Sequence, residues 1–221
     1  MWQLITEDNL KYFQLQYGNY LLIYSTKYSE EKFLKKFNPV FLKQIHSDII
    51  VDIDRPAEMI GDGLMTRTDR PIGIKVADCL PVYLFDGEKI CILHCGWRSL
   101  FRGILKNVLQ IFKDYKYALG SAIGPCCYEI KDDVADIFNK KFSGSLIYKD
   151  KKIFLDLKKA VIKILGNENL IGNLDYCTKC HPEYFYSYRG GDVNKRNYAV
   201  ILQLHPGNLF VKGIESIRKF N

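Results

Sequence analysis

The chain has 221 residues, of which 48% are hydrophobic, 14% aromatic and 26% charged, and its formal net charge is +7. This composition excludes a disordered or fibrous protein and predicts a folded protein with one well-buried core. The basic residues are spread along the chain and do not form the pattern of a nucleic-acid-binding module, so we expect no nucleic-acid partner.

The first residues contain acidic side chains and no apolar core of the length that a signal peptide needs. No segment reaches the roughly 18 uncharged apolar residues of a membrane span. We therefore expect a cytoplasmic protein that does not associate with membranes. Its seven cysteines would be reduced in that compartment, and an odd number at irregular spacing does not indicate a disulfide framework.

Apolar runs of strand length alternate with helical patterns along the chain. In chain order, strands are expected at 19–26, 40–46, 71–85 (interrupted at Asp78 and Cys79) and 89–95. A strand followed by a Gly-Pro turn is expected within 117–127, and two more strands are expected around a Gly-Gly loop within 184–205. Helices are expected at 30–37, 98–112, 132–142 and 156–166. Because strands outnumber helices and the order is mixed, we predict an α+β fold with more than one sheet layer.

Three residues of types that bind metals lie at or near the ends of apolar runs: His46, Cys79 and His94. Strand ends that are distant in sequence can converge in space. Two imidazoles and a thiolate suit Zn²⁺ and leave a fourth position for water or substrate. The gaps of 33 and 15 residues match no compact zinc motif. From spacing alone, structural roles for all three residues are the simpler interpretation.

A second group is Cys177, Cys180 and His181 in the segment CTKCH. The C-x-x-C spacing fits zinc ribbons and redox pairs, but a structural zinc site needs a second ligand pair, and the sequence has no second C-x-x-C. We interpret this cluster as mainly structural, with an adventitiously bound metal as the alternative. Two adjacent cysteines on a strand face opposite sides, so Cys126 is expected to face a pocket and Cys127 to pack in the core.

Six segments together carry a resemblance to a known family. They are LKQIHSD (42–48), GDGLMT (61–66), VADCLPVYLFD (76–86), LHCGWRSLFRGI (93–104), AIGPCCYEI (122–130) and FYSYRGGDVNKRNYAVI (185–201). In this order they resemble the YfiH-like family, formerly labelled laccase-domain or multicopper polyphenol oxidoreductase proteins. The family is now regarded as purine nucleoside phosphorylases with adenosine deaminase side activity.

The family's metal ligands are the histidine of its Q-V-H motif, the cysteine of A-D-C and the histidine of H-x-G-W-R. These match His46, Cys79 and His94, so the resemblance implies a zinc site with Cys79 at the catalytic centre. It also implies a purine nucleoside and phosphate as substrates. The fold expected is a single α+β domain over residues 1–221, with mixed β-sheets packed in layers and flanked by helices (α/β/β/α type).

This chain departs from the family pattern at several positions. Cys95 and Ser99 stand in the H-x-G-W-R motif region, Lys43 stands where arginine is common, and Lys195 with Arg196 replaces a common Gly-Arg pair. The family's Asn-Leu-Gly segment near the N-terminus is not apparent, and a shorter segment, 14–30, takes its place. The preferred nucleoside is therefore left open.

Other residues have candidate roles in this chemistry. Arg98 is a candidate phosphate ligand or a salt-bridge partner that docks the following helix. Asp62 and Asp78 are candidate proton relays; alternatively, Asp62 caps a turn and Asp78 orients a histidine. Trp97 stacks on a purine or packs in the core. The residues expected around the substrate are Lys43, Cys126, Arg189 and Arg196.

Other functions remain open at this point. Cys79 is a possible nucleophile, with His46 or His94 as its base, in a metal-free cysteine hydrolase. The family has also been linked to editing of peptidoglycan precursors, and a zinc-stabilised binding module is the non-enzymatic alternative. A multicopper centre does not fit a chain with four histidines. Either a monomer or a homodimer is expected.

Overall fold

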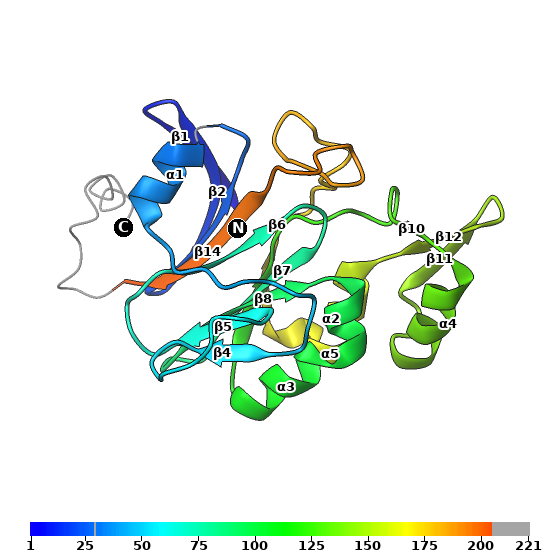
Figure 1. Cartoon of the computed structure of the whole chain (residues 1–221), viewed down its shortest axis with the longest axis horizontal. Coiled ribbons are helices and arrows are strands. Elements are labelled where there is room, and N and C mark those ends of the chain that lie inside the picture. The colour runs from blue at the N-terminus through cyan, green and yellow to red at the C-terminus, as the bar shows by residue number, and fades with distance from the viewer. Residues whose placement is uncertain (29, 205–221) are drawn as a thin grey trace.

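The computed structural model describes residues 1–28 and 30–204, and its strands form three sheets (Figure 1). The first sheet has five antiparallel strands in the order β1 (Gln3–Glu7), β2 (Leu10–Tyr17), β3 (Tyr20–Ser25), β14 (Asn197–Gln203) and β6 (Ile72–Val76). The second sheet has six strands in the order β13 (Leu170–Asn173), β9 (Lys116–Leu119), β7 (Leu80–Phe85), β8 (Ile90–Cys95), β5 (Gly63–Thr66) and β4 (Ile50–Asp52). It is mixed, because its two edge pairs are parallel and the others antiparallel.

The two large sheets pack face to face around a shared core. The five-stranded sheet contributes Phe13, Leu22 and Ile74, and the six-stranded sheet contributes Tyr83 and Ile92. All five side chains are almost fully buried. Burial of this apolar surface between the sheets is the main force that holds the layers together.

Helices cover the outer faces of both sheets. The helix α1 (Glu30–Phe37) packs on the five-stranded sheet through its phenylalanines. The helices α3 (Ile104–Ile111) and α5 (Leu157–Leu165) pack on the six-stranded sheet. The predicted α+β fold with α/β/β/α layers is therefore confirmed.

The strand β3 explains why a continuous apolar run is needed in a central strand. Leu22 and Tyr24 face the core between the sheets, whereas Leu21 and Ile23 face α1 on the other side. Side chains alternate along a strand, so a strand covered on both faces is apolar at every position.

The remaining elements form a smaller unit at one end of the molecule (right side of Figure 1). Here β10 (Glu129–Ile130), β12 (Lys152–Leu155) and β11 (Leu146–Lys149) pair in an antiparallel sheet. The helix α4 (Asp132–Lys141) packs beside them, and a short 3₁₀ helix, Asn167–Asn169, follows α5.

The helix expected at 98–112 is interrupted. It forms α2 (Trp97–Arg102) and α3, which meet at Gly103 with a φ of 108°. This left-handed conformation is accessible to glycine at little cost, and it ends one helix while starting the next. The predicted apolar face is still buried, because Leu100, Ile104 and Val108 all join the core beneath the six-stranded sheet.

Two expected strands are absent from the described residues. Residues 40–46 make only isolated bridges, Val40 with Ile72 and Lys43 with Ile60, because this segment passes from one pairing partner to another. Residues 184–196 form turns before β14 and not a second strand. Conversely, β1 and β2 form a hairpin in a region where the sequence predicted no strand.

Residues 205–221 lie outside the described residues, so the extension of one domain to residue 221 stays a prediction. Within residues 1–28 and 30–204, no helix is long and apolar enough to cross a membrane.

Candidate metal centre

The metal-type residues meet where the chain crosses between the two large sheets. The strand β6 belongs to the five-stranded sheet and β7 to the six-stranded sheet, so residues 77–79 make the crossing. Asp78 has a φ of 88°, and its carbonyl accepts a hydrogen bond from the Ile123 N–H at 3.0 Å. This sharp turn directly precedes Cys79.

The two histidines approach the same point from different elements. His94 is near the end of β8, where its N–H donates to the Asp62 carbonyl at 2.7 Å. His46 lies in a loop with a φ of 57°, and its carbonyl accepts a hydrogen bond from Arg102 at 2.8 Å. The left-handed backbone at His46 is uncommon for a residue with a side chain and indicates that the surrounding contacts fix it.

The ligand atoms of His46, Cys79 and His94 all lie within 4.8 Å of one another. The two imidazole rings have centroids 5.0 Å apart and an interplanar angle of 63°. Glycine at position 96 makes this approach possible, since a Cβ there would lie 2.9 Å from the Cys79 sulfur. This donor set could hold a metal, and three protein ligands with two nitrogens and a sulfur suit Zn²⁺.

Asp62 lies behind the histidine and fixes its orientation. Its Oδ1 is 2.7 Å from the His94 Nδ1, and its Oδ2 accepts hydrogen bonds from the backbone of Ser47 and Ile45 and from the Ser47 hydroxyl. Asp62 is fully buried. With Nδ1 engaged by the carboxylate, Nε2 of His94 is the nitrogen available to a metal.

Asp62, Cys79 and His94 shift one another's pKa values toward the charged forms. Burial raises the pKa of Asp62, but hydrogen bonds from His94 and Ser47 outweigh it and lower the pKa to about 2. Burial also raises the pKa of Cys79, but the charge of His94 and hydrogen bonds from both histidines lower it to about 6. Burial lowers the pKa of His94, yet the Cys79 charge and the Asp62 carboxylate raise it to about 9. The group therefore favours a thiolate, the form that binds metals.

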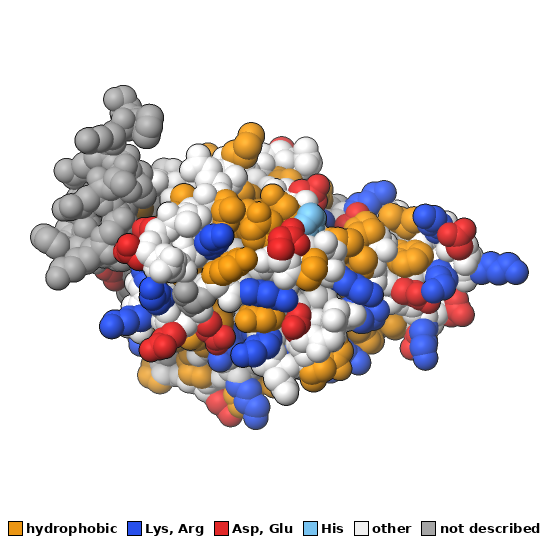
Figure 2. Space-filling view, turned by 90° about the horizontal axis from the view of Figure 1, so that it is seen from above, with side chains coloured by type: hydrophobic (Ala, Val, Ile, Leu, Met, Phe, Trp, Pro, Cys, Tyr) orange, Lys and Arg blue, Asp and Glu red, His pale blue; other side chains and the backbone are white. Residues whose placement is uncertain are grey.

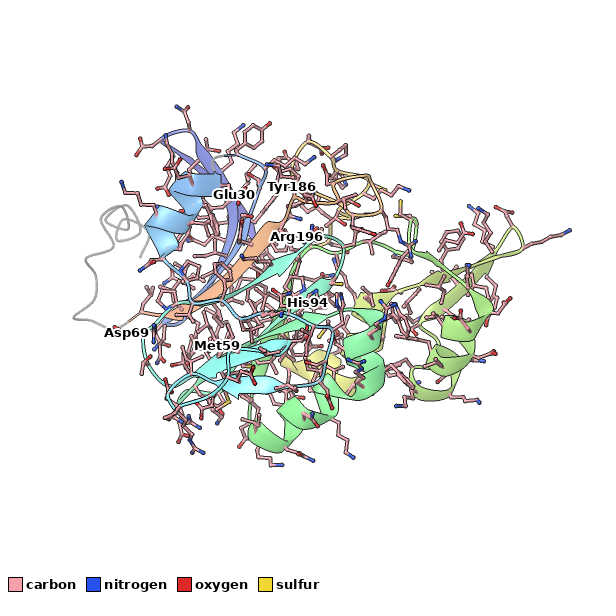
Figure 3. All side chains as sticks on the ribbon, in the orientation of Figure 1. Glu30, Met59, Asp69, His94, Tyr186 and Arg196 are labelled. Carbon is pink, nitrogen blue, oxygen red and sulfur yellow. The ribbon has the colours of Figure 1, made fainter. Side chains whose placement is uncertain are left out.

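The three residues lie at a cavity of about 790 Å³. Figure 3 labels His94 near the middle of the molecule and Arg196 at the start of β14, and both line this cavity. Basic side chains surround it: Lys43, Lys75, Arg98, Arg189 and Arg196. On the face seen in Figure 2, Lys and Arg are interspersed with Asp and Glu.

Two of these arginines are held against aromatic rings. The Arg98 guanidinium lies 4.5 Å from the Trp97 ring centroid, and the Arg189 guanidinium lies 5.1 Å from that of Tyr128. Within the described residues, no carboxylate lies within 4.0 Å of either guanidinium, so the expected salt bridge of Arg98 is not formed there. Trp97 is half-buried; it packs against the core and its ring also contacts the Arg98 guanidinium.

Asp78 and Cys126 have surroundings that differ from those expected. The Asp78 carboxylate accepts hydrogen bonds from the Thr178 hydroxyl and the Arg189 N–H, both at 2.7 Å, so it fastens the 178–189 loop and not a histidine. Cys126 is exposed and is not among the residues that line the cavity.

Sequence reasoning missed several residues that line the cavity: Gln44, Lys75, Tyr128 and Tyr188. Gln44, Tyr128 and Tyr188 lie inside the quoted segments, and Lys75 directly precedes the segment 76–86, so position in or beside these segments was the available signal. For Lys75 this signal was weak, because an exposed lysine near the end of β6 looks like an ordinary surface residue.

Comparison with known proteins identifies the family. The model of the family described as multi-copper polyphenol oxidoreductase laccase matches residues 27–203. The chain belongs to this family. The resemblance to YfiH-like proteins is thus confirmed.

The curated relatives that resemble this chain are named purine nucleoside phosphorylases. A purine nucleoside phosphorylase of Clostridium acetobutylicum is 37% identical over 166 residues, which cover 67% of this chain and 70% of the relative. The purine nucleoside phosphorylase YfiH of Escherichia coli is 31% identical over 166 residues, or 68% of each chain.

Solved structures share the fold. YlmD from Geobacillus stearothermophilus superposes with a TM-score of 0.79 at 20% identity and covers 91% of this chain and 99% of that one. The YfiH protein of Bacillus licheniformis gives a TM-score of 0.74 at 21% identity and covers 91% and 99%.

Proposed function

We propose that this chain is a zinc-dependent purine nucleoside phosphorylase with adenosine deaminase side activity. It would convert adenosine and inosine, with phosphate, into the free base and ribose 1-phosphate, and methylthioadenosine into adenine and the corresponding methylthioribose 1-phosphate. The names of its relatives support the reaction class. The observation that carries the proposal is a cavity lined both by arginines that lie against aromatic rings and by the group His46, Cys79 and His94.

The arginines supply the phosphate site in this proposal. Stacking on Trp97 and Tyr128 restrains Arg98 and Arg189 before any ligand arrives, so less side-chain freedom is lost on binding. Their forked N–H donors match the oxygens of phosphate. Lys43, Lys75 and Arg196 add positive charge around the same cavity. Together these groups would hold phosphate and neutralise charge as the glycosidic bond breaks.

The group of three metal-type residues fits zinc, since its donors are two imidazoles and a thiolate that converge around Gly96. Zinc held by them would supply a Lewis acid at the base of the cavity. The chain's own contribution is orientation: Asp62 holds His94, and Asp78 holds the loop that carries Arg189. We assign both aspartates positioning roles in this mechanism.

Tyr188 is our candidate for contact with the purine. Its side chain is 55% exposed and lines the cavity, whereas the rings of Trp97 and Tyr128 already carry arginines. An exposed ring beside a basic cavity offers a stacking surface to a flat heterocycle. A cavity of about 790 Å³ lies within the usual size range of small-molecule sites.

The test is chromatography of adenosine incubated with the pure protein, with and without phosphate. Adenine and ribose 1-phosphate formed only when phosphate is present are expected. Inosine in both samples would report deamination. Intact adenosine in a sample that contains zinc would overturn the proposed reaction, and mis-loaded UDP-MurNAc-amino acid would then be assayed as the peptidoglycan precursor.

The lowered pKa of Cys79, about 6, favours one second candidate, a metal-free cysteine hydrolase with His46 or His94 as base. Zinc content separates the two mechanisms. Turnover by protein that contains no zinc at this site, lost when a single thiol is alkylated, would favour the hydrolase. Turnover that requires zinc would exclude it.

A further inference from the structure

Four cysteines come together outside the cavity. Cys126 and Cys127 lie in the turn after Pro125, and Cys177 and Cys180 lie in a turn that follows β13. Their four sulfur atoms all lie within 4.8 Å of one another. All four thiols are free, and none of these residues lines the cavity around His94.

The turn changes what adjacent cysteines can do. On a strand, Cys126 and Cys127 would face opposite sides, but in the turn both reach Cys180, at S–S separations of 3.6 and 3.4 Å. The sequence has no second C-x-x-C to complete a zinc site with Cys177 and Cys180. The adjacent pair Cys126 and Cys127, from a turn distant in sequence, supplies the two missing thiols. His181 is not in the group; its Nδ1 pairs with Glu183 at 2.9 Å.

The separations match a single tetrahedral ion. Sulfurs bound to one Zn²⁺ at about 2.3 Å lie about 3.8 Å apart. A disulfide needs about 2.05 Å, well below the 3.4 and 3.6 Å between these thiols. An iron–sulfur cluster places its own iron and sulfide atoms between the cysteines, which separates their sulfurs further than one ion does.

The backbone around the cysteines is arranged for close approach. The Gly124 N–H donates to the Cys177 sulfur at 3.2 Å, which stabilises negative charge on that sulfur. A Cβ at Gly124 would lie 3.2 Å from both the Cys126 sulfur and the Cys177 Cβ. The two turns are already joined, because the Thr178 N–H donates to the Ala122 carbonyl at 3.0 Å.

We propose that Cys126, Cys127, Cys177 and Cys180 bind one Zn²⁺ in a closed, structural site. Four protein ligands leave no position for substrate, in contrast to the group of three at His94. Exposure of Cys126 and Cys180 gives the ion a path from solvent. The half-buried Cys127 and Cys177 pack against the core and anchor the ion to it.

This second site fastens one wall of the cavity. Tyr128 directly follows Cys127, and the loop from Cys177 leads through Thr178 to Arg189. The Asp78 carboxylate holds Thr178 and Arg189 from the other side. Zinc at the four cysteines therefore holds Tyr128 and Arg189 in place without taking part in any reaction, and its presence does not depend on the proposed activity.

The experiment measures zinc per chain in the purified full-length protein by mass spectrometry under reducing conditions. We expect about two zinc ions for the wild type and about one for Cys180→Ser, with Cys79→Ala also losing one. The Cys180→Ser, Cys79→Ala double variant should lose both. Cys180→His should regain the second ion, because imidazole also binds zinc.

Cobalt substitution identifies the ligands independently of activity. In Cys79→Ala, Co²⁺ should give the intense visible absorption and sulfur-to-cobalt charge-transfer bands of a tetrahedral thiolate site. One zinc ion in the wild type that Cys180→Ser leaves in place would overturn the site, as would iron or a Cys126–Cys180 disulfide in freshly purified protein. If Cys180→Ser fails to fold, the cobalt spectrum of Cys79→Ala decides the question.

Discussion

The Nδ1 atom of His94 lies 2.7 Å from the Oδ1 atom of Asp62, a carboxylate with no exposed surface. Since three further hydrogen bonds from Ser47 and Ile45 hold Oδ2 of this carboxylate, the imidazole ring is fixed with its other nitrogen facing Cys79. The site is therefore oriented before a metal arrives.

Asp62→Asn tests this orientation. It removes the negative charge that supports His94 while keeping the size of the side chain. Loss of such a supporting carboxylate typically weakens metal binding by about 10- to 100-fold, and we expect a change of that size in zinc affinity measured by competition with a chelator.

Asp69→Asn is the matched control, because Asp69 lies at the edge of the molecule, far from His94 (Figure 3). It should leave zinc affinity unchanged. Equal affinities for both variants would show that Asp62 does not support the metal centre.

Gly96→Ala tests the close packing around the cysteine. The added Cβ would lie 2.9 Å from the Cys79 sulfur and 3.5 Å from His46 Cδ2. Overpacking of this kind costs about 1–3 kcal/mol, so we expect weaker zinc binding and a lower free energy of unfolding in denaturant titrations.

Ser99→Ala, in the helix α2 that begins directly after Gly96, is the control for Gly96→Ala. The Ser99 hydroxyl is buried and makes no hydrogen bond with the described residues, so its removal should cost little. Zinc affinity of Gly96→Ala equal to that of Ser99→Ala would contradict the steric argument.

Arg98→Ala tests the phosphate site. A charge-assisted hydrogen bond to phosphate is worth about 1.5–3 kcal/mol, so the KM for phosphate should rise by about tenfold to a hundredfold. Arg98→Lys should recover part of the loss, because lysine keeps the positive charge but lacks the forked N–H donors of arginine.

Arg55→Ala is the control, because Arg55 is exposed and lies outside the cavity. It should leave initial rates at varied phosphate unchanged. An unaltered KM in Arg98→Ala would remove this residue from the site.

Removal of the metal tests the reaction itself. Cys79→Ala should lose one zinc ion and nucleoside turnover together, whereas Cys91→Ala, which alters a core thiol, should retain both. With the metal removed, the lowered pKa of Cys79 keeps its thiolate dominant at pH 7, since about 6 lies below that pH. Iodoacetamide should then alkylate Cys79, and zinc should protect it, as followed by peptide mass spectrometry. Full turnover by Cys79→Ala without zinc would end the proposed mechanism.

Much of the fold was predictable because it depends on local patterns. The apolar runs gave β3, β8 and β9, and the interruption at Asp78 and Cys79 separated β6 from β7. The helix break at Gly103 was missed, because the apolar period continues through it and only the backbone conformation shows the change. The apolar run at 40–46 predicts a strand that does not form, because this segment packs without a continuous pairing partner.

By itself, the sequence determined which chemistry is available: histidines and cysteines at the ends of apolar runs, and basic motifs near them. Only the tertiary structure decided which of them meet. Sheet pairing brings Asp62 behind His94, and two distant turns bring Cys126 and Cys127 to Cys180. The spacing of residues along the sequence does not predict these contacts, because they depend on where the chain crosses between sheets and on how its turns pack.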